Sequence, residues 1–406
     1  MKAAVVGGGL AGLAAALELV DSGHEVTVLE ARPTLGGKVQ TLPERDGDPD
    51  PPPDNGQHIA LGCFSAYLGF LERIGSLGWA DRRPLALPVI DERGRVATIG
   101  YGLLPLLRYR HLPLRERLQV AAFLARLERI DPGTGTFGEL LRAHGQSQRV
   151  IERFWDVFVR PALNLRCDEV AAADAIATVL IALRSGRAAS DLVLPRTPLG
   201  LMHGEAACAA LEAVGATVKT GVRVDDLDAL DADVVVLAVP PEESARLLGE
   251  DDPGFEHSPI VSVHLLFDRR ILRHELAALL GSPAHWVFDR GALTRRGARR
   301  GQYLTVVSSG APELMDVRGL ELVELMRHEL TQRLGPAEVL WSRVSREPEA
   351  TLALRPGVVR PSPETGQPGV VRAGAWLAGL PPTMENAVQT GRVAARVVSK
   401  QVAVPA

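Results

Sequence analysis

The stretch Lys2-Ala-Ala-Val-Val-Gly-Gly-Gly-Leu-Ala-Gly12 decides the fold predicted for this chain of 406 residues. An apolar run from Lys2 to Val6 leads into a cluster of glycines, and an alanine-rich segment follows from Leu10 to Ser22. A second apolar run covers Glu25 to Leu29. This order predicts a strand, a turn, a helix and a second strand, which together form a βαβ unit. The glycines argue against a signal peptide or a membrane span, because they interrupt the run where a continuous helix would be needed.

Within the predicted turn the glycines follow the spacing Gly7-x-Gly9-x-x-Gly12. The first glycine permits a tight turn, the second lets the backbone approach a pyrophosphate, and the third allows close packing of helix on strand. Free N–H groups at the helix N-terminus favour an anionic ligand there. Glu30 closes the second strand, where a carboxylate accepts hydrogen bonds from ribose hydroxyls and repels a 2′-phosphate. The unit therefore predicts a dinucleotide site that disfavours NADP, with a tight turn in an unrelated α/β protein as the alternative.

The composition describes a near-neutral chain with ample material for packed cores. Hydrophobic residues make up 46% and charged residues 23%, and 45 Lys+Arg against 49 Asp+Glu give a formal charge of −4. These values exclude intrinsic disorder and leave no electrostatic field for general nucleic-acid binding. The three cysteines are widely spaced, so neither a disulfide framework nor a CxxC metal pair is present, and we expect no metal. We expect a multi-domain cytoplasmic enzyme.

Beyond the first unit the sequence alternates between a mainly helical pattern and a pattern typical of α/β proteins. An acidic, proline-rich loop at Asp46–Asp54 is predicted to tether the first unit to the next segment. From Trp79 to Pro198 the pattern is helical, and α/β texture returns after Gly200. We expect helices at His203–Ala213 and Leu320–Leu334, and strands at Thr217–Val224, Ala232–Pro241, Ile260–Phe267, Tyr303–Ser308 and Val339–Arg343.

A second glycine pair, Gly36-Gly37, follows shortly after Glu30 and is itself followed by Lys38. NAD binding does not need this pair. It resembles the extended fingerprint of FAD-binding proteins of the amine oxidase and phytoene desaturase superfamily. The resemblance implies FAD as the cofactor and a cation near its phosphates, although the family usually has arginine there and Lys38 lacks the bidentate fork. A Gly-Gly turn with a solvated lysine is the alternative.

The C-terminal region resembles the closing motif of the same superfamily. The series Gly379-Leu-Pro-x-Thr-x-Glu-x-Ala-Val-x-x-Gly391 matches it well. In the family, N–H groups at the start of this helix face the flavin and stabilise negative charge on it. The preceding family signature Ala-Gly-Asp departs here, because Ala375 stands where the aspartate is expected. That loss removes a polar contact, and an ordinary terminal helix is the alternative.

Four internal segments resemble one member family, the hydroxysqualene dehydroxylases, and with the two ends they extend the resemblance over nearly the whole chain. The family implies reductive loss of the hydroxyl group of hydroxysqualene to give squalene. It also implies an apolar isoprenoid substrate held in a dry, hydrophobic tunnel. An FAD-dependent carotenoid or phytoene-type desaturase, a flavin amine oxidase, and a binding module without FAD remain the alternatives. The four segments are Asp54-Asn-Gly-Gln-His58, Pro161-Ala-Leu-Asn164, Pro259-Ile-Val-Ser-Val-His264 and His285-Trp-Val-Phe-Asp289.

The predicted fold class is α/β, with a discontinuous Rossmann-like FAD-binding domain and a second, α+β substrate-binding domain. The first is expected to comprise residues 1–79, 199–256 and 353–406, and the second residues 80–198 and 257–352. The expected cofactor contacts are Gly7, Gly9, Leu10, Ala11, Gly12, Glu30, Ala31, Arg32, Gly36, Gly37, Lys38, Gly56, Gln57, Val224, Gly374, Ala375, Thr383 and Met384.

The family motif makes His58 the preferred candidate for a proton donor, because imidazole titrates near neutrality and hydroxide is a poor leaving group. Asp54 or Asp289 would orient His58 or donate in its place. A structural histidine beneath the flavin is the alternative for His58. Trp286 and Phe288 are candidates for lining the tunnel, or else belong to the core.

The segment Tyr101–Leu114 places apolar residues beside Arg108 and Arg110, and an amphipathic helix is predicted at Arg115–Ile130. A basic amphipathic stretch can lie on an anionic bilayer. We therefore expect a cytoplasmic protein with peripheral association at the inner face of the cell membrane; a core-packed helix is the alternative.

Overall fold

The computed structural model describes residues 1–184, 186–295 and 301–402, and it confirms the predicted βαβ unit. Strand β1 (Lys2–Val6), helix α1 (Leu10–Asp21) and strand β2 (Glu25–Glu30) follow each other, and β1 pairs with β2 in parallel. The ends lie within one residue of the prediction. Side chains of β1 alternate between two faces, both of which are covered, and this explains why the strand is apolar throughout.

A five-stranded parallel sheet surrounds this unit in the order β15-β9-β1-β2-β8. Strand β9 (Val234–Leu237) is wholly buried, as its continuous apolar run predicts, and β15 (Val370–Arg372) forms one edge. Strand β8 (Thr217–Thr220) ends four residues earlier than predicted. The chain turns there at Gly221, whose N–H donates to the Arg32 carbonyl oxygen at 3.0 Å. The sheet thus draws on three separate parts of the sequence.

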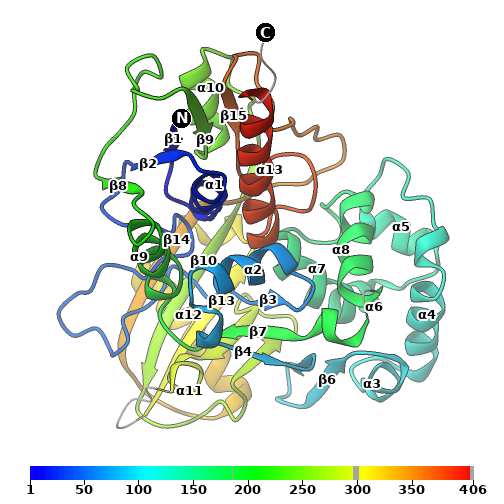
Figure 1. Ribbon diagram of the computed structural model, residues 1–406. Helices are drawn as coiled ribbons and strands as arrows, with labels where there is room; N and C mark the ends of the chain where they lie inside the picture. Colours follow the sequence, from blue (N-terminus) through cyan, green and yellow to red (C-terminus); the bar gives the residue numbers. More distant parts are fainter. Residues whose placement is uncertain (185, 296–300, 403–406) are drawn as a thin grey trace.

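Helix α13 (Met384–Val402) lies beside α1 on one face of this sheet (Figure 1). A Cβ on Gly391 would overlap the Ala11 carbonyl oxygen, so glycine allows the two helices to approach this closely. Further along, Glu18 pairs with Arg392 and Arg396. Because the contacts advance along both helices together, α1 and α13 run in the same general direction, and α13 begins about two turns before Gly391.

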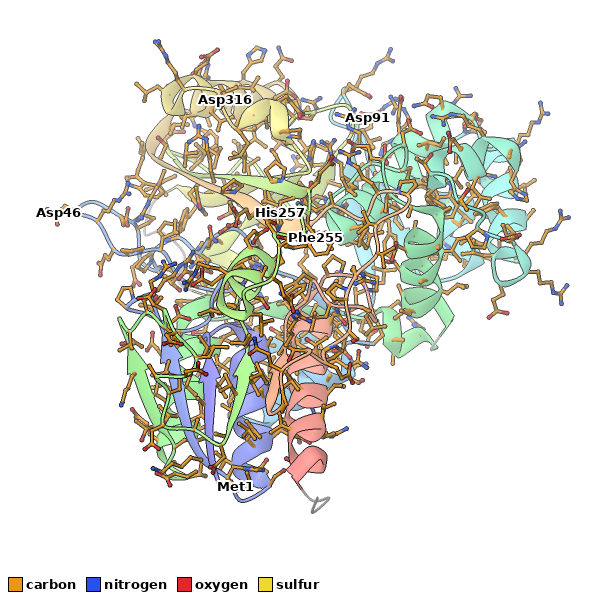
Figure 2. The ribbon with its side chains drawn as sticks, turned by 90° about the horizontal axis from the view of Figure 1, so that it is seen from above. Met1, Asp46, Asp91, Phe255, His257 and Asp316 are labelled. Carbon is orange, nitrogen blue, oxygen red and sulfur yellow. The ribbon has the colours of Figure 1, made fainter. Side chains whose placement is uncertain are left out.

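A mixed seven-stranded sheet forms the other half of the molecule, in the order β14-β10-β13-β12-β11-β5-β6. On its second strand β10 (His257–Phe267), Val261, Val263 and Leu265 pack under α12 (Gly319–Leu334) in an apolar core. The intervening His264 points to the opposite face, as alternation in a strand requires. In Figure 2, Met1, which precedes β1 of the parallel sheet, and Asp316 near α12 lie at opposite ends, with Phe255 and His257 between them.

The prediction of a helical region from Trp79 to Pro198 is wrong at both ends. Residues 80–100 form three strands and residues 192–195 a fourth. The sequence Asp91-Glu-Arg-Gly94 makes a hairpin turn, because the Asp91 carboxylate accepts from two backbone N–H groups and Gly94 has a φ of +75°. Helices do occupy residues 103–184, although α4 (Leu114–Leu124) ends six residues before the predicted Ile130. Among the described residues, no helix is long and apolar enough to cross a membrane.

The remaining helices and strands lie between the elements already described. The helices are α2 (Ser65–Arg73), α3 (Leu103–Arg108), α5 (Phe137–Ala143), α6 (Gln148–Val150), α7 (Asp156–Leu163), α8 (Ala172–Arg184), α9 (Ala206–Glu212), α10 (Pro241–Leu248) and α11 (Arg290–Thr294), with π-helical turns η3 (Ile151–Trp155) and η5 (Leu201–Glu205) and 3₁₀ turns η1 (Leu77–Trp79), η2 (Leu127–Arg129), η4 (Arg187–Ser190) and η6 (Pro312–Leu314). The strands are β3 (Ala60–Leu61), β4 (Ala80–Arg83) and β7 (Leu192–Pro195) in a three-stranded sheet, and β5 (Ala86–Ile90), β6 (Val96–Gly100), β11 (Leu276–Leu279), β12 (Trp286–Asp289), β13 (Gln302–Ser309) and β14 (Val339–Leu352) in the seven-stranded sheet.

Candidate cofactor and active site

The glycine turn between β1 and α1 uses its glycines for different reasons. Gly7 has a φ of +107°, a conformation that side chains rarely adopt. A Cβ on Gly12 would overlap the Gly7 carbonyl oxygen, so only glycine lets α1 approach β1 this closely. At Gly9, in contrast, the nearest protein atom to a Cβ would lie 3.8 Å away. The protein itself requires glycine at positions 7 and 12, whereas Gly9 leaves backbone open to a ligand.

The second glycine pair lies directly beside this turn. The Gly36 N–H donates to the Gly8 carbonyl oxygen at 2.8 Å, and Gly36 forms a parallel bridge with Gly9. A Cβ on Gly37 would lie 3.0 Å from the Gly9 Cα. Two glycine groups that the sequence separates by more than twenty residues therefore form one bare backbone surface.

Glu30 completes this surface at the end of β2. Its carboxylate accepts hydrogen bonds from the Gly8 N–H at 2.6 Å and from the Arg32 N–H at 2.8 Å. Ala31 and Arg32 themselves are exposed. The carboxylate is held at the rim of the glycine turn, where an acid that binds ribose would have to lie.

The start of α1 is open to an anionic group. Its N-cap residue, Gly9, offers no side chain to the first N–H groups, and the first turn contains no acidic residue. Leu10 and Ala11 are both buried, so these N–H groups lie inside the molecule rather than in bulk water. Free donors and the positive end of the helix dipole are what a pyrophosphate needs, and the residues present fit FAD.

Lys38 contacts the backbone of β14 rather than the start of α1. Its ammonium group donates to the carbonyl oxygens of Glu349 and Ala350 in β14. Burial lowers the pKa of Lys38, while the nearby charges of Glu347 and Glu349 oppose this shift. The contact ties the second glycine pair to the seven-stranded sheet, and the phosphate contact that the resemblance implies stays a prediction.

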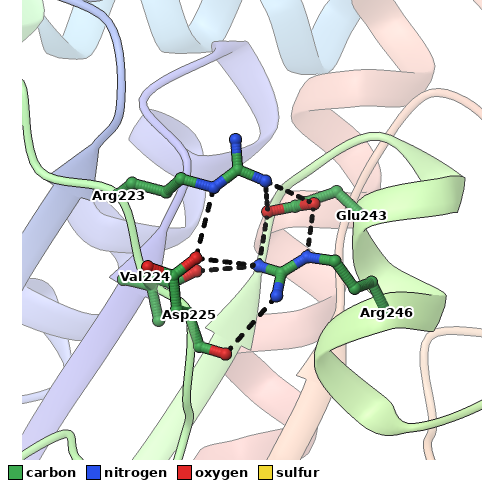
Figure 3. Close-up of polar contacts among 5 residues, drawn as sticks. All are labelled: Arg223, Val224, Asp225, Glu243 and Arg246. Carbon is green, nitrogen blue, oxygen red and sulfur yellow. Dashed lines mark hydrogen bonds and ion pairs between the residues drawn. The ribbon is translucent and has the colours of Figure 1, made fainter.

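Val224, expected to contact the cofactor, is held by an arginine from α10 (Figure 3). Arg246 donates to the Val224 carbonyl oxygen at 3.0 Å and is itself held by Glu243 at 2.8 Å. Arg223 bridges Asp225 and Glu243, each at 3.3 Å. The chain after β8 is thereby fixed against α10, and the contact between Val224 and the cofactor stays a prediction.

The loop after β15 keeps its shape without the family aspartate. The Asn386 amide donates to the Ala375 carbonyl oxygen at 2.9 Å and accepts from the Leu380 N–H at 3.2 Å. The Gly374 N–H donates to the Thr390 hydroxyl at 3.1 Å. Two side chains of α13, Asn386 and Thr390, therefore hold the loop through its backbone groups. This support does not depend on which side chain stands at position 375.

The start of α13 is equally well fixed. The Thr383 hydroxyl accepts from the Asn386 N–H at 3.4 Å, and Met384 begins the helix; both Thr383 and Met384 are half-buried. The buried Glu385 accepts two N–H groups at the start of α2, from Ala66 at 2.9 Å and from the next residue at 2.8 Å. The N-terminal end of α13 is held in place and still presents partly accessible residues.

Asp54 is committed to a buried polar network. Its side chain forms an ion pair with Arg290, and both side chains are only 2% exposed. It also accepts from the Thr41 hydroxyl at 2.7 Å and from the Leu199 N–H at 3.0 Å. These contacts use both carboxylate oxygens, so Asp54 holds the loop of residues 41–58 in place and is poorly placed to donate a proton.

The same loop is anchored a second time at its acidic, proline-rich part. Asp48 forms an ion pair with Arg343 of β14 at 2.6 Å, and these side chains are 2% and 5% exposed. Arg343 also donates to the Pro43 carbonyl oxygen at 2.9 Å. The loop that the sequence predicts as a tether is therefore bound to the polar face of the seven-stranded sheet.

His58 follows these anchors and differs from Asp54 in having a free ring nitrogen. Its Nδ1 is buried and has no hydrogen-bond partner among the described residues. Gly56 and Gln57 precede it, with a left-handed φ of +87° at Gly56. Burial lowers the pKa of His58, and the charges of Asp54 and Glu347 oppose the shift. The imidazole is available for a new hydrogen bond.

A further polar atom without a partner lies on the sheet face under this loop. The hydroxyl of Tyr303 is buried and unpaired among the described residues, whereas His264 on the same face forms a hydrogen bond with the backbone of Asp54. His264 Nδ1 contacts the Thr305 hydroxyl at 3.0 Å, and burial with the charge of Arg290 lowers the pKa of His264 to about 3. Buried polar atoms are rarely left unpaired, so water or a polar ligand group belongs here.

The aromatic residues of β12 lie on the same face. Phe288 is opposite Thr305 in the strand register, and Trp286 and Phe288 stack with ring centroids 6.2 Å apart. Both are buried in the larger apolar core. Asp289 caps α11 and accepts from the Gln302 amide at 2.6 Å, so its carboxylate is occupied away from His58.

Sequence reasoning missed several residues that build the site. Arg290 follows directly after the quoted segment that ends at Asp289, and a charged residue there was a usable signal. Asn386 lies inside the closing motif at one of its variable positions. The buried pair of Tyr67 and His203, joined at 2.7 Å, gave no signal, because the two residues are 136 positions apart.

Two cavities lie apart from the glycine turn and from the loop. The larger, about 390 Å³, is lined by polar and charged side chains that include Asp156 and Arg160, and Trp286 of β12 also contributes to its wall. The smaller, about 330 Å³, lies between α10 and Trp376. Neither is lined by the glycine turn or by residues 54–58, so neither is assigned to the substrate.

Comparison with known proteins gives the same picture over the full length. A family model described as flavin containing amine oxidoreductase matches residues 10–196 and 200–399. A solved structure of an oxidoreductase from Methanosarcina mazei superposes with a TM-score of 0.76 at 19% identity, covering 98% of this chain and all of that one.

Among curated proteins, a hydroxysqualene dehydroxylase of Sinorhizobium fredii is 28% identical over 96% of both chains. Another, of Rhodopseudomonas palustris, is 28% identical over 97% of both. A probable zeta-carotene desaturase of Synechococcus elongatus is 25% identical over the full length of both chains. The resemblance stated from the sequence motifs is thereby confirmed.

Proposed function

The chain belongs to the family of flavin containing amine oxidoreductases and is an FAD-dependent oxidoreductase, and we propose that it removes the hydroxyl group of hydroxysqualene reductively to give squalene. The observation that carries this proposal is the extent of the similarity. It covers 96–97% of this chain and of two hydroxysqualene dehydroxylases, so it includes the seven-stranded sheet as well as the nucleotide-binding segments.

The reaction breaks one C–O bond and forms one C–H bond. When bound and reduced, FAD supplies the hydride, and the hydroxide leaves with a proton as water. The glycine turn, Glu30 and the start of α13 would hold the cofactor. The loop of residues 54–58 is bound to the polar face of the seven-stranded sheet, and we assign to it the departing hydroxyl.

His58 is the residue we assign to that hydroxyl group. Its Nδ1 is buried and unpaired among the described residues, whereas Asp54 and Asp289 are occupied by structural partners. As imidazolium, His58 would donate the proton that turns hydroxide into water. Because burial lowers its pKa, the protonated form needs either mild acid or a negative charge nearby to persist.

The surroundings suit an isoprenoid substrate. Trp286 and Phe288 belong to the larger apolar core, and Phe288 lies opposite Thr305 of the polar sheet face. A long hydrocarbon has few polar handles, so its binding depends on apolar area removed from water, about 25 cal/mol per Å². The proposed substrate class also favours the inner face of the cell membrane as the place of action.

An anaerobic single turnover tests the proposal. Photoreduced holoprotein mixed with hydroxysqualene should reoxidise its flavin and yield one squalene per flavin, measured by absorbance and mass spectrometry. Squalene itself, which lacks the hydroxyl group, serves as the control and should leave the flavin reduced. If hydroxysqualene also leaves the flavin reduced and no squalene forms, the proposal is wrong.

A carotenoid desaturase is the second candidate, and the full-length similarity to a probable zeta-carotene desaturase favours it over other members of the family. That reaction moves hydride towards the flavin instead of away from it. Oxidised holoprotein incubated anaerobically with phytoene or zeta-carotene would then bleach, while oxidised holoprotein with hydroxysqualene would not. An amine that bleaches the flavin would point to an amine oxidase.

A further inference from the structure

Helices α3 and α4 expose four leucines to solvent, which we call the leucine surface: Leu103, Leu104, Leu114 and Leu118. Their exposed fractions are 58%, 57%, 58% and 52%. Leu103 and Leu104 begin α3, whereas Leu114 and Leu118 lie one turn apart on α4, and the two helices contact each other. Large apolar side chains gathered this way mark an interaction surface more often than isolated ones do.

The leucines are not left over from a loosely packed region. Leu106, Leu112, Val120 and Phe123 on the inner sides of the same segment are buried in the larger apolar core. These buried residues account for the helical spacing of apolar residues in the sequence. The four exposed leucines are apolar residues beyond those that the core uses. Figure 1 places α3 and α4 at an outer edge of the molecule, on the opposite side from β8.

Positive charge is concentrated in the same segment as the leucine surface. Residues 101–127 contain five arginines and one glutamate, although the whole chain carries a formal charge of −4. Arg108, Arg110 and Arg115 are exposed. The glutamate, Glu116, is buried and bound to Arg149 at 2.8 Å, so it does not offset these charges at the surface.

We propose that the leucine surface and these arginines dock the protein on a bilayer that contains anionic lipid. Leucines would enter the boundary between headgroups and acyl chains, while the arginines contact lipid phosphates. A bilayer suits this surface because it offers apolar depth and negative charge together over a broad area. The helices beneath belong to the same core as Trp286 and Phe288, so the docked side is continuous with the apolar side of the candidate site.

The inference rests on the proposed function only for its purpose, since a squalene-like substrate is dissolved in membranes. Binding itself can be measured without turnover. Full-length holoprotein is floated with vesicles of phosphatidylcholine alone, or of phosphatidylcholine mixed with phosphatidylglycerol. We expect flotation with the mixed vesicles and its loss in high salt, because the arginine contribution is screened.

Two variants and a matched control identify the surface. Leu103→Ser/Leu104→Ser should reduce flotation about tenfold, and Arg108→Gln/Arg110→Gln should reduce it with the anionic vesicles. Leu320→Ser, which changes an 85% exposed leucine on α12, should float like the unchanged protein. FAD content and turnover of detergent-dispersed hydroxysqualene should stay the same in the leucine variant, which separates docking from catalysis.

Three results would overturn the inference. The unchanged protein would fail to float with anionic vesicles, or Leu103→Ser/Leu104→Ser would float normally. Alternatively, sedimentation would show a dimer that the leucine variant dissolves, in which case a second copy covers the surface.

Discussion

The glycine turn at residues 7–12 and the loop at residues 41–58 both contribute to the candidate site, but they are built by opposite means. In the turn, the main constraint is the absence of side chains, as at Gly12, where a Cβ would overlap the backbone. The loop depends on charged side chains, through the buried pairs Asp54–Arg290 and Asp48–Arg343. One region is a backbone surface, and the other is a polar network.

This difference follows from what each region does. A pyrophosphate binds to backbone N–H groups, which exist in any sequence once the chain is bare enough and correctly turned. A loop without regular secondary structure has no ladder of its own, so side chains from the sheet must hold it. The turn should therefore respond to added volume, and the loop to lost charge.

The largest effect on stability is expected from breaking the buried ion pair of the loop. Asp54→Ala leaves Arg290 buried without its counter-charge and should cost about 3–5 kcal/mol. Arg290→Ala should cost a similar amount for the same reason. The free energy of unfolding from denaturant titration, measured on each variant, gives the effect.

A double-mutant cycle decides whether the pair acts as a unit. Asp54→Ala/Arg290→Ala should cost clearly less than the two single changes together, because no unpaired charge remains. Additive losses would mean that the two side chains stabilise the protein separately. Full stability of Asp54→Ala with lost turnover would make Asp54 catalytic and end the contrast between loop and turn.

The fold of the turn could be predicted from the sequence because its signals are local. The β1–α1–β2 unit was predicted to within one residue at each boundary, from glycine spacing and apolar runs. The strands at residues 80–100 were missed, although Asp91-Glu-Arg-Gly94 is a turn signal between two runs with β-branched residues. The Leu- and Arg-rich sequence that follows outweighed it.

The loop could not be predicted in the same way. Asp54 and Arg290 are 236 positions apart, and Asp48 and Arg343 are 295 apart, so no local pattern joins them. Prolines and aspartates in the loop indicate only a turn-rich, solvated segment. The motif did point to His58 and Asp54. Only the structure shows that Asp54 is bound to Arg290 and anchors the loop, whereas His58 keeps a ring nitrogen without a partner among the described residues.

The next prediction concerns His58 and the chemistry of the loop. His58→Gln keeps a polar side chain but no titratable group, and it should slow squalene formation about a hundredfold if imidazolium donates the proton. Burial lowers the pKa of His58 below its ordinary 6.5, so the unchanged protein should be fastest in mild acid and slow down as pH rises through that pKa. The variant should lose this slope. A variant with the same pH profile would place the donor elsewhere.

Added volume in the turn should show smaller effects, which separate two of its glycines. Gly12→Ala forces a Cβ into the Gly7 carbonyl and should cost about 1–3 kcal/mol even without FAD. Gly9→Ala should leave the stability of the apoprotein unchanged, because the nearest protein atom is 3.8 Å away. It should weaken FAD binding instead. Thermal unfolding with and without FAD measures both, and a destabilised Gly9→Ala apoprotein would contradict the backbone-surface interpretation.

The smallest expected effect tests whether charged side chains also support the backbone near the glycine turn, as they support the loop of residues 41–58. Arg246→Ala removes the donor to the Val224 carbonyl oxygen, whereas Arg223→Ala removes only exposed ion pairs with Asp225 and Glu243. Exposed ion pairs contribute little, so Arg223→Ala should leave FAD affinity unchanged and Arg246→Ala should weaken it by less than about fivefold. Flavin fluorescence titration of both apoproteins measures the difference. If the two variants bind FAD equally well, the backbone after β8 holds its place without the arginine, and the nucleotide end depends on backbone alone.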